Sequence, residues 1–276
     1  MNSTEPGRWA LRLSFPLAVL LAAASLEGLF LPSTYSEETR VHAAQYVGND
    51  AGNFGVVVPV LVIAAMLALR GSVAARLVWV GTLVYLVYDF INYAFAVHFN
   101  SVFLVYCGVL GLSVYALAGG LLTLPTAEIA RRYGPRTPVK TTAGVLLLIG
   151  VAAVLHWLSE IIPALLAGRV PKAMRDSGQL TEAVAVLDLA FGAPACMIAA
   201  ILLLRRKPLG FIFGPVVLTF LILSSLVLAP MGIAMVRHGF ETGYALCALG
   251  LGIAMGSAVL LTLCLRGGNA SSQSGV

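Results

Sequence analysis

The stretch PVLVIAAMLALR, residues 59–70, is an apolar run that opens on a proline and closes on an arginine. With the apolar residues before it, from about residue 54, it has the roughly 17–25 residues that an α-helix needs to cross the hydrocarbon core of a bilayer. A proline inside such a run is compatible with a helix, because membrane helices tolerate it. The stretch therefore predicts a transmembrane helix at about 54–70.

Runs of the same kind recur along the whole chain. Of its 276 residues, 59% are hydrophobic and only 11% are charged, which is more apolar surface than a soluble protein of this size can bury. Short breaks such as RGS at 70–72 and RRKP at 205–208 are typical of tight turns between antiparallel helices. We predict an all-α polytopic membrane bundle in a lipid bilayer, with eight spans at about 12–32, 54–70, 75–98, 101–124, 141–166, 184–204, 209–235 and 243–265.

The first of these spans has a second interpretation. Arg8 and Arg12, followed by an apolar run that ends in AAASLEG, resemble a cleaved signal peptide. The run is long for the apolar region of a signal peptide, and the internal repeat described below requires a helix at this place. We therefore interpret it as a transmembrane helix.

The distribution of basic residues predicts the orientation. With eight spans, twelve of the 17 Lys and Arg residues fall on one side, Arg136 among them, and five fall on the other, including Arg169 and Lys172. Because short cytoplasmic connections carry an excess of basic residues, we expect a multi-pass protein of the cell membrane with both termini in the cytoplasm. The net charge of +5 is then a topology signal, and it indicates no nucleic-acid partner.

The stretch 59–70 has a counterpart 135 residues later. PACMIAAILLLR, residues 194–205, is identical to it at seven of twelve positions, including the proline and the final arginine. Each copy follows a predicted long outer loop, at about 33–53 and 167–183. Each loop follows a span with a glutamate near its outer end and then a proline: Glu27 with Pro32, and Glu160 with Pro163.

This similarity predicts a tandem duplication of a four-helix unit. The first half covers 1–135 and the second 136–266, and the Gly/Ser-rich residues 267–276 form a disordered cytoplasmic tail. Because four is an even number, both halves insert in the same orientation and are related by an axis along the membrane normal.

Three further segments resemble a group of bacterial eight-helix integral membrane proteins. They are FNSVFLVYCGVLGLSVYAL at 99–117, AVLDLAF at 185–191 and LLLRRKPLGF at 202–211. The resemblance implies the eight-helix architecture. It implies no activity, because none is established for that group.

Ionisable side chains within the spans are the candidate functional residues. Each costs several kcal/mol in a bilayer unless it faces protein or water. His156 and Glu160 are four residues apart, so they share one helix face and can form an acid–base pair. All the candidates lie in the outer half of the membrane, where we expect one cavity open to the outside; they are Glu27, Asp89, His156, Glu160 and Asp188.

The same side chains have purely structural interpretations. Intramembrane carboxylates and histidines often bond only to neighbouring helices, and Asp188 is also placed to stabilise a helix N-terminus. Asp50 and His98 lie so near the predicted surface that we expect them to be solvated. His42 and His238 are expected in loops.

Cofactor chemistry has little support in the sequence. Two histidines with several carboxylates are compatible with a transition-metal site, but no HExxH or repeated Glu-x-x-His occurs, and the four cysteines form no CxxC. No Walker A, GxSxG or aspartate-rich diphosphate motif is present, and the lysines lie at span edges, where no retinal could attach. We predict neither cofactor nor metal.

Three functions stay open. The first is a membrane-embedded enzyme that performs acid–base chemistry on a small or lipid-like molecule from the outer leaflet. The second is a proton- or cation-coupled transporter, and the third is a non-catalytic scaffold subunit, with an oligomer possible for any of them. The outer position of the charges favours the enzyme over the transporter, because alternating access uses a site near the midplane.

Overall fold

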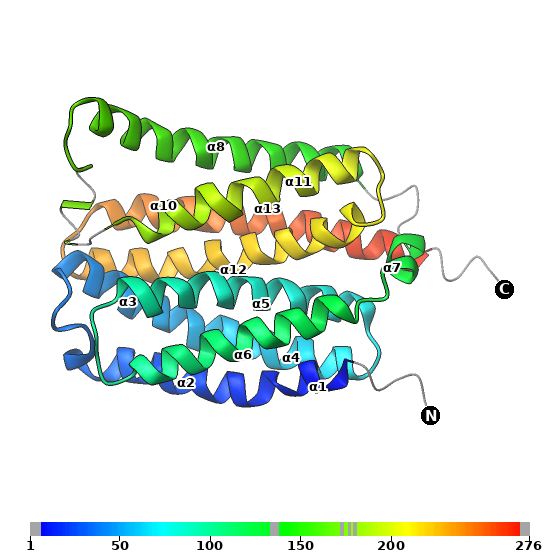
Figure 1. The fold of residues 1–276 in the computed structure, drawn as a ribbon, viewed down its shortest axis with the longest axis horizontal. Coiled ribbons are helices and arrows are strands. Elements are labelled where there is room, and N and C mark those ends of the chain that lie inside the picture. The colour runs from blue at the N-terminus through cyan, green and yellow to red at the C-terminus, as the bar shows by residue number, and fades with distance from the viewer. Residues whose placement is uncertain (1–6, 133–137, 172–173, 176–177, 179–180, 271–276) are drawn as a thin grey trace. The chain divides into compact units, whose positions relative to one another are not determined.

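In the computed structural model, residues 7–132, 138–171, 174–175, 178 and 181–270 are described, and most of them lie in helices (Figure 1). Eight helical stretches are long and apolar enough to cross a membrane, which confirms the predicted all-α bundle of a multi-pass membrane protein. They are α1–α2 (Arg8–Arg12, Ser14–Phe30), α3–η2–α4 (Arg40–Gly52, Asn53–Val57, Val58–Leu69), α5 (Val73–Ala96), α6 (Phe103–Leu122), α8 (Val139–Leu166), α10–η3–α11 (Ala183–Leu187, Asp188–Gly192, Ala193–Leu204), α12 (Gly210–Arg237) and α13 (Thr242–Ala270).

The chain forms two compact units. Unit 1 comprises 1–125 and 218–262, and unit 2 comprises 126–217 and 263–276, so α12 and α13 each run from one unit into the other. These units are defined by contacts, whereas the predicted halves are defined by internal similarity. The division at 135/136 and the duplication therefore stay predictions.

The two predicted tight turns are confirmed. α4 ends at Leu69 and α5 begins at Val73, where the Ser72 hydroxyl caps the new helix by accepting the Ala75 N–H at 3.2 Å. Gly71 supplies the left-handed conformation of this turn, with φ of 92°. The second turn separates α11 from α12, between Leu204 and Gly210.

The predicted outer loop at 33–53 is wrong over most of its length. After a single 3₁₀ turn, η1 (Pro32–Tyr35), the chain enters α3, where the Thr39 hydroxyl accepts the His42 N–H at 3.4 Å. The segment is too polar to be recognised as a span by hydropathy. It is helical because polar side chains such as Asn49 and Asp50 are bonded inside unit 1 and not to water.

The other end of the chain also departs from the expectation. α13 continues to Ala270, beyond the predicted start of the tail at 267. Residues 271–276 lie outside the described residues, as do Arg136 and Lys172 of the orientation argument.

A π-helical turn interrupts two of the spans. η2 (Asn53–Val57) precedes α4 and η3 (Asp188–Gly192) precedes α11, and in both cases a proline, Pro59 or Pro194, follows at the second position of the next helix. A proline ring in a helix clashes with the carbonyl four residues earlier, which here lies inside the π turn. The wider π turn removes this clash. The two π turns begin at Asn53 and Asp188, which are 135 residues apart.

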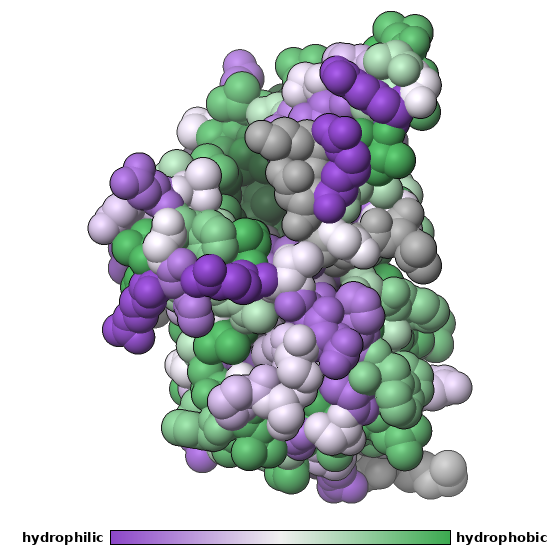
Figure 2. Space-filling view, turned by 90° about the vertical axis from the view of Figure 1, so that its left-hand side faces the viewer, coloured by the Kyte–Doolittle hydropathy of each residue, from purple (hydrophilic) through white to green (hydrophobic). Residues whose placement is uncertain are grey.

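Unit 1 is held by close helix packing around aromatic side chains. Trp79 of α5 is fully buried and donates its indole N–H to the Ser14 hydroxyl of α2 at 2.7 Å. Gly48 of α3 lies directly against the backbone of α12 at Pro230 and Met231. In the lower part of Figure 2, hydrophilic side chains occupy the end of unit 1 where α2 joins α3, and hydrophobic side chains occupy its flanks, as a bilayer requires.

Unit 2 is organised by the contact of α8 with α11. Gly150 of α8 lies against the Ala193 carbonyl and Cys196 of α11, so closely that a Cβ at residue 150 would lie 3.0 Å from the Ala193 carbonyl oxygen. Much of the rest of α8 is exposed and apolar, for example Leu148 and Leu155. In a membrane protein such a surface is suited to lipid.

The contact of Gly48 with α12 provides a test of the packing. A Cβ at residue 48 would lie 2.6 Å from the Met231 amide nitrogen, so Gly48→Ala must push two backbones apart. We expect the substitution to destabilise the protein by about 1–3 kcal/mol, the usual cost of overpacking, measured as a lower melting temperature in detergent. Gly111→Ala in α6 is the control, because its Cβ would meet nothing within 4 Å. Equal melting of the two variants would contradict this packing.

Candidate functional site

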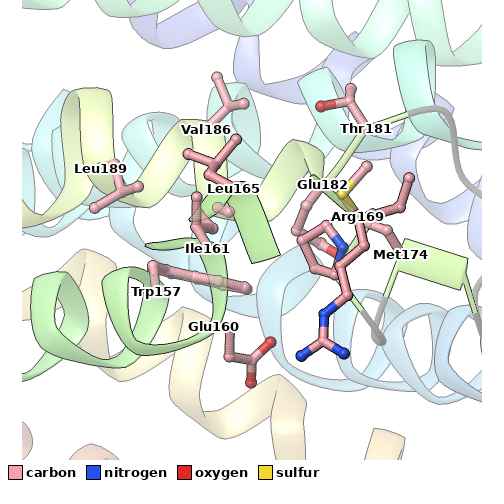
Figure 3. A pocket seen from close by; sticks show the side chains of 13 residues that line it. Trp157, Glu160, Ile161, Leu165, Arg169, Met174, Thr181, Glu182, Val186 and Leu189 are labelled. Atoms are coloured by element: carbon pink, nitrogen blue, oxygen red, sulfur yellow. The ribbon is translucent and has the colours of Figure 1, made fainter. Parts of the chain in front are cut away.

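A pocket in unit 2 contains one of the predicted site residues, Glu160. The pocket has a volume of about 380 Å³ and lies among the last turns of α8, the chain after α8 and the start of α10. Its walls are mainly apolar, and three charged residues line it: Glu160, Arg169 and Glu182. Figure 3 shows Glu160 and Arg169 with their charged ends on the same side of the pocket. The volume and the apolar lining are those of small-molecule sites in general.

The local sequence accounts for the position of Arg169. α8 ends at Leu166, and Gly168 then adopts a left-handed conformation with φ of 59°, which turns the chain back on itself. The Arg169 N–H is donated to the Ala164 carbonyl at 3.0 Å. This places the Arg169 guanidinium at the pocket, which the apolar side chains of Ile161 and Leu165 from the end of α8 also line.

Glu182 is the pocket residue best suited to hold a proton. It stands just before α10, and burial raises the pKa of its carboxyl, with the negative charge of Glu160 raising it further. A carboxyl that stays protonated closer to neutral pH is a competent general acid. Glu182 is not among the predicted site residues, because no sequence signal shows that the chain folds back over α8.

Asp188 is linked to the pocket through a tryptophan. It begins the π turn η3, and its carboxylate accepts the indole N–H of Trp157 at 2.9 Å, while Trp157 itself lines the pocket. His156 is exposed and is not among the lining residues; its ring contacts that of Trp157 at 5.0 Å between centroids. The structure therefore places Glu160 and Trp157 in the lining of one pocket, bonds Asp188 to that Trp157, and leaves His156 outside the lining.

Asp89 lies in unit 1, where it is 7% exposed and belongs to a buried hydrogen-bonded network. Its Oδ1 accepts the side-chain N–H of Asn49 at 2.9 Å, and its Oδ2 accepts that of Asn53 at 2.8 Å. The Asn53 carbonyl oxygen in turn accepts the hydroxyl of Tyr85 at 2.8 Å. Asn53 is the first residue of η2, and its side-chain amide donates to Asp89 of α5.

Asp50 belongs to the same network, and our expectation that it is solvated is wrong. It is 2% exposed, and it bonds to the hydroxyls of Tyr35 at 2.6 Å and Tyr93 at 2.9 Å. Tyr93 also accepts the second side-chain N–H of Asn49 at 3.0 Å, so the groups of the two carboxylates are continuous. Burial and the nearby Asp50 raise the pKa of the Tyr35 hydroxyl, which keeps this phenol neutral.

Glu27 and the outer histidines lie at the same end of unit 1. Glu27 is half-buried and accepts a hydrogen bond from the Ser101 hydroxyl. His98 is exposed, as expected, and its ring bonds to the Glu38 carboxylate at 2.9 Å. Because Glu27 and Asp89 belong to a different unit from His156, Glu160 and Asp188, the prediction that all five share one cavity stays a prediction.

Metal binding finds no support in this geometry. Within the described residues, no group of three or more His, Cys, Asp or Glu side chains is arranged to hold a metal ion. The polar centres of the two units instead combine carboxyl groups with hydroxyls, amides and one guanidinium. Such groups bind protons and hydrogen-bonding ligands.

No protein family, curated protein or solved structure matches this chain.

The raised pKa of Glu182 predicts how stability depends on pH. The folded protein holds this proton more tightly than the unfolded chain does, so the stabilisation is present below the ordinary pKa of 4.5 and is lost as the pH rises through the higher folded value. We therefore expect Glu182→Gln to reduce the fall in melting temperature between about pH 4 and pH 8. Glu241→Gln, at an exposed carboxyl, should leave that fall unchanged. A Glu182→Gln profile identical to that of the unmodified protein would refute this assignment.

Proposed function

We propose that the protein is a membrane-embedded enzyme that performs acid–base chemistry on an amphiphilic molecule held in the unit 2 pocket. The observation that carries the proposal is the half-buried carboxyl of Glu182 in a mainly apolar pocket that also presents Glu160 and Arg169. We also propose that the protein lies in the cell membrane with both termini in the cytoplasm, as its basic residues predict. The pocket then opens at the outer leaflet.

Each part of the pocket has a proposed role. Apolar side chains such as Ile161, Leu165 and Leu189 take the hydrocarbon part of the ligand, and Arg169 pairs with an anionic or strongly polar head. Glu182 donates a proton to the reacting group, and Glu160, the exposed carboxylate, receives a proton from the nucleophile or from water. This assignment replaces the acid–base pair of His156 and Glu160 that the sequence suggested by Glu182 and Glu160, and it gives His156 no part.

We infer that the two predicted halves share an origin. The support is the repetition, at the same 135-residue offset as the sequence match, of a π turn, a following proline and a terminal arginine. Under this proposal Asn53 and Asp188 are equivalent positions that have diverged, one amide and one carboxylate. An experimental structure whose halves superpose only after inversion in the membrane plane would contradict it.

A proton-coupled transporter is the second candidate, and one observation favours it. Unit 1 buries the two carboxylates Asp50 and Asp89, and no ion pair of the described residues includes either of them. Buried intramembrane carboxylates are the usual carriers of coupling protons. A scaffold subunit, the third candidate, requires no pocket with charged lining.

The pocket's affinity for amphiphiles can be measured through Trp157. Bromine atoms quench a tryptophan on contact, so a short-chain brominated phosphatidylglycerol should quench Trp157 saturably in the detergent-solubilised protein. Arg169→Gln should weaken this binding by about tenfold or more, because it removes a charged hydrogen-bond donor. A brominated neutral alcohol of equal chain length is the control and should bind both proteins alike. Quenching that Trp157→Phe leaves unchanged would place the ligand elsewhere.

Turnover separates the enzyme from the alternatives. The protein in nanodiscs of mixed phospholipids should produce a new lipid species, detected by mass spectrometry of the extracted lipids. Glu182→Gln preserves the shape and loses the proton, so it should lower the rate by about 10²–10⁴-fold, the usual contribution of a positioned proton-transfer group. Glu241→Gln should have full activity. Lipids unchanged by the unmodified protein, together with proton-dependent uptake into proteoliposomes, would favour the transporter.

A further inference from the structure

The buried network of unit 1 contains two carboxyl groups, those of Asp50 and Asp89, and the network cannot stabilise both in the ionised form. Asp50 and Asp89 are 2% and 7% exposed, and they are joined through only two side chains, Tyr93 and Asn49. No Lys, Arg or His of the described residues pairs with either carboxylate. Two uncompensated negative charges this close in an apolar interior are strongly disfavoured, so such pairs hold a proton.

The hydrogen-bond partners show which carboxyl can hold that proton. Both oxygens of Asp89 accept amide N–H groups, of Asn49 and Asn53, and an N–H cannot accept a proton from a carboxyl. The Tyr85 hydroxyl also lies beside this carboxyl, but its own hydrogen is donated to the Asn53 carbonyl oxygen. The two amide contacts favour the ionised form of Asp89. The amide of Asn53 is held in this orientation by the Tyr85 hydroxyl, which needs an acceptor and finds the Asn53 carbonyl oxygen at 2.8 Å.

The two oxygens of Asp50 differ from each other. Tyr93 already accepts an N–H from Asn49, so its own hydrogen points to Asp50 Oδ1. Tyr35 is bonded to Asp50 Oδ2 at 2.6 Å and can rotate its hydroxyl to accept instead of donate. Asp50 Oδ2 therefore has a neighbour that can accept a hydrogen bond from a protonated acid and that is itself bonded to a further hydroxyl, that of Tyr106.

A connection leads from Tyr35 toward the end of unit 1. The Tyr106 hydroxyl adjoins that of Tyr35, and Tyr106 accepts the side-chain N–H of Asn100 at 3.4 Å. Asn100 is half-buried at the start of the chain that leads into α6, next to Ser101 with its bond to Glu27. On the other side, a Cβ at Gly28 of α2 would overlap both Asp50 Oδ2 and Tyr35, so the α2 backbone closes the site there.

We propose that Asp50 is a proton-binding site that exchanges its proton with water at the α2–α3 end of unit 1 through the hydroxyls of Tyr35 and Tyr106. On release, the Asp50 Oδ2 proton passes to the Tyr35 oxygen as the Tyr35 proton passes to Tyr106, which gives up its own proton toward the solvent. Each tyrosine stays neutral, and Asp50 is left as a carboxylate. The ionisable groups around Asp50 are Tyr35 from the α2–α3 connection, Tyr85, Asp89 and Tyr93 from α5, Tyr106 from α6 and, farther out, Glu27 from α2.

This site is separate from the unit 2 pocket, and it does not depend on the enzyme proposal. If Asp50 holds no proton, the roles proposed for Glu182 and Arg169 are unaffected. If it does, the protein has a proton store whatever the pocket binds.

Infrared spectroscopy of the protein in nanodiscs can test the proposal, because a protonated carboxyl has a C=O stretch distinct from that of a carboxylate. In a Glu182→Gln background, which removes the pocket carboxyl proposed to hold a proton, we expect this band to be present, to be lost when Asp50→Asn is added and to remain when Asp89→Asn is added. Transfer into D₂O should shift the band, and Tyr35→Phe should slow that shift by about tenfold, since one hydroxyl of the path is gone. Retention of the band in Asp50→Asn with its loss in Asp89→Asn would mean that the Asn53 amide is reversed and the proton sits on Asp89, which overturns the proposal. Absence of any such band would overturn it as well.

A second comparison keeps the test decisive if Asp50→Asn does not fold. Tyr35→Phe removes the hydroxyl bonded to Asp50, and Tyr85→Phe removes the hydroxyl next to Asp89. Both substitutions keep the aromatic ring. The band should change frequency in Tyr35→Phe and stay in place in Tyr85→Phe. The opposite pattern would assign the proton to Asp89.

Discussion

The constraint on which this structure depends is the cost of leaving a polar group without a partner in apolar surroundings. In a bilayer the backbone meets this constraint by forming helices. The polar side chains of unit 1 meet it by bonding to one another, from Tyr35 through Asp50, Tyr93 and Asn49 to Asp89. The same constraint makes α3 helical, because Asn49 and Asp50 find their partners in the interior and not in water.

The two units meet the constraint in different ways, and this separates their chemistry. In unit 1 every oxygen of Asp50 and Asp89 has a hydrogen-bond partner, and the network is packed and closed. In unit 2 the charged groups Glu160, Arg169 and Glu182 line a pocket with mainly apolar walls. A closed network is suited to storing a proton, and an apolar pocket with charges at its wall is suited to an amphiphile.

The π turns connect the helices to these polar centres. Each turn accommodates a proline that would otherwise clash with the helix, and each begins with a polar residue that bonds to another helix: Asn53 to Asp89 of α5, and Asp188 to Trp157 of α8. The additional residue in a π turn changes the direction of the side chains that follow, and such turns are frequent at functional sites. Here Asn53 and Asp188 are the first residues of the two turns.

The sequence by itself determined the eight spans and the turns at 70–72 and 205–208, because long apolar runs and Gly/Pro breaks act locally. It also identified Asp89, Glu160 and Asp188 as ionisable groups within those spans. Only the tertiary structure decided that Asp50 is buried, that Glu182 rather than His156 lines the pocket, and that residues 40–52 are helical. These outcomes depend on partners such as Tyr35 and Tyr93, far apart in the chain, and no local pattern shows whether a polar side chain will meet such a partner or water.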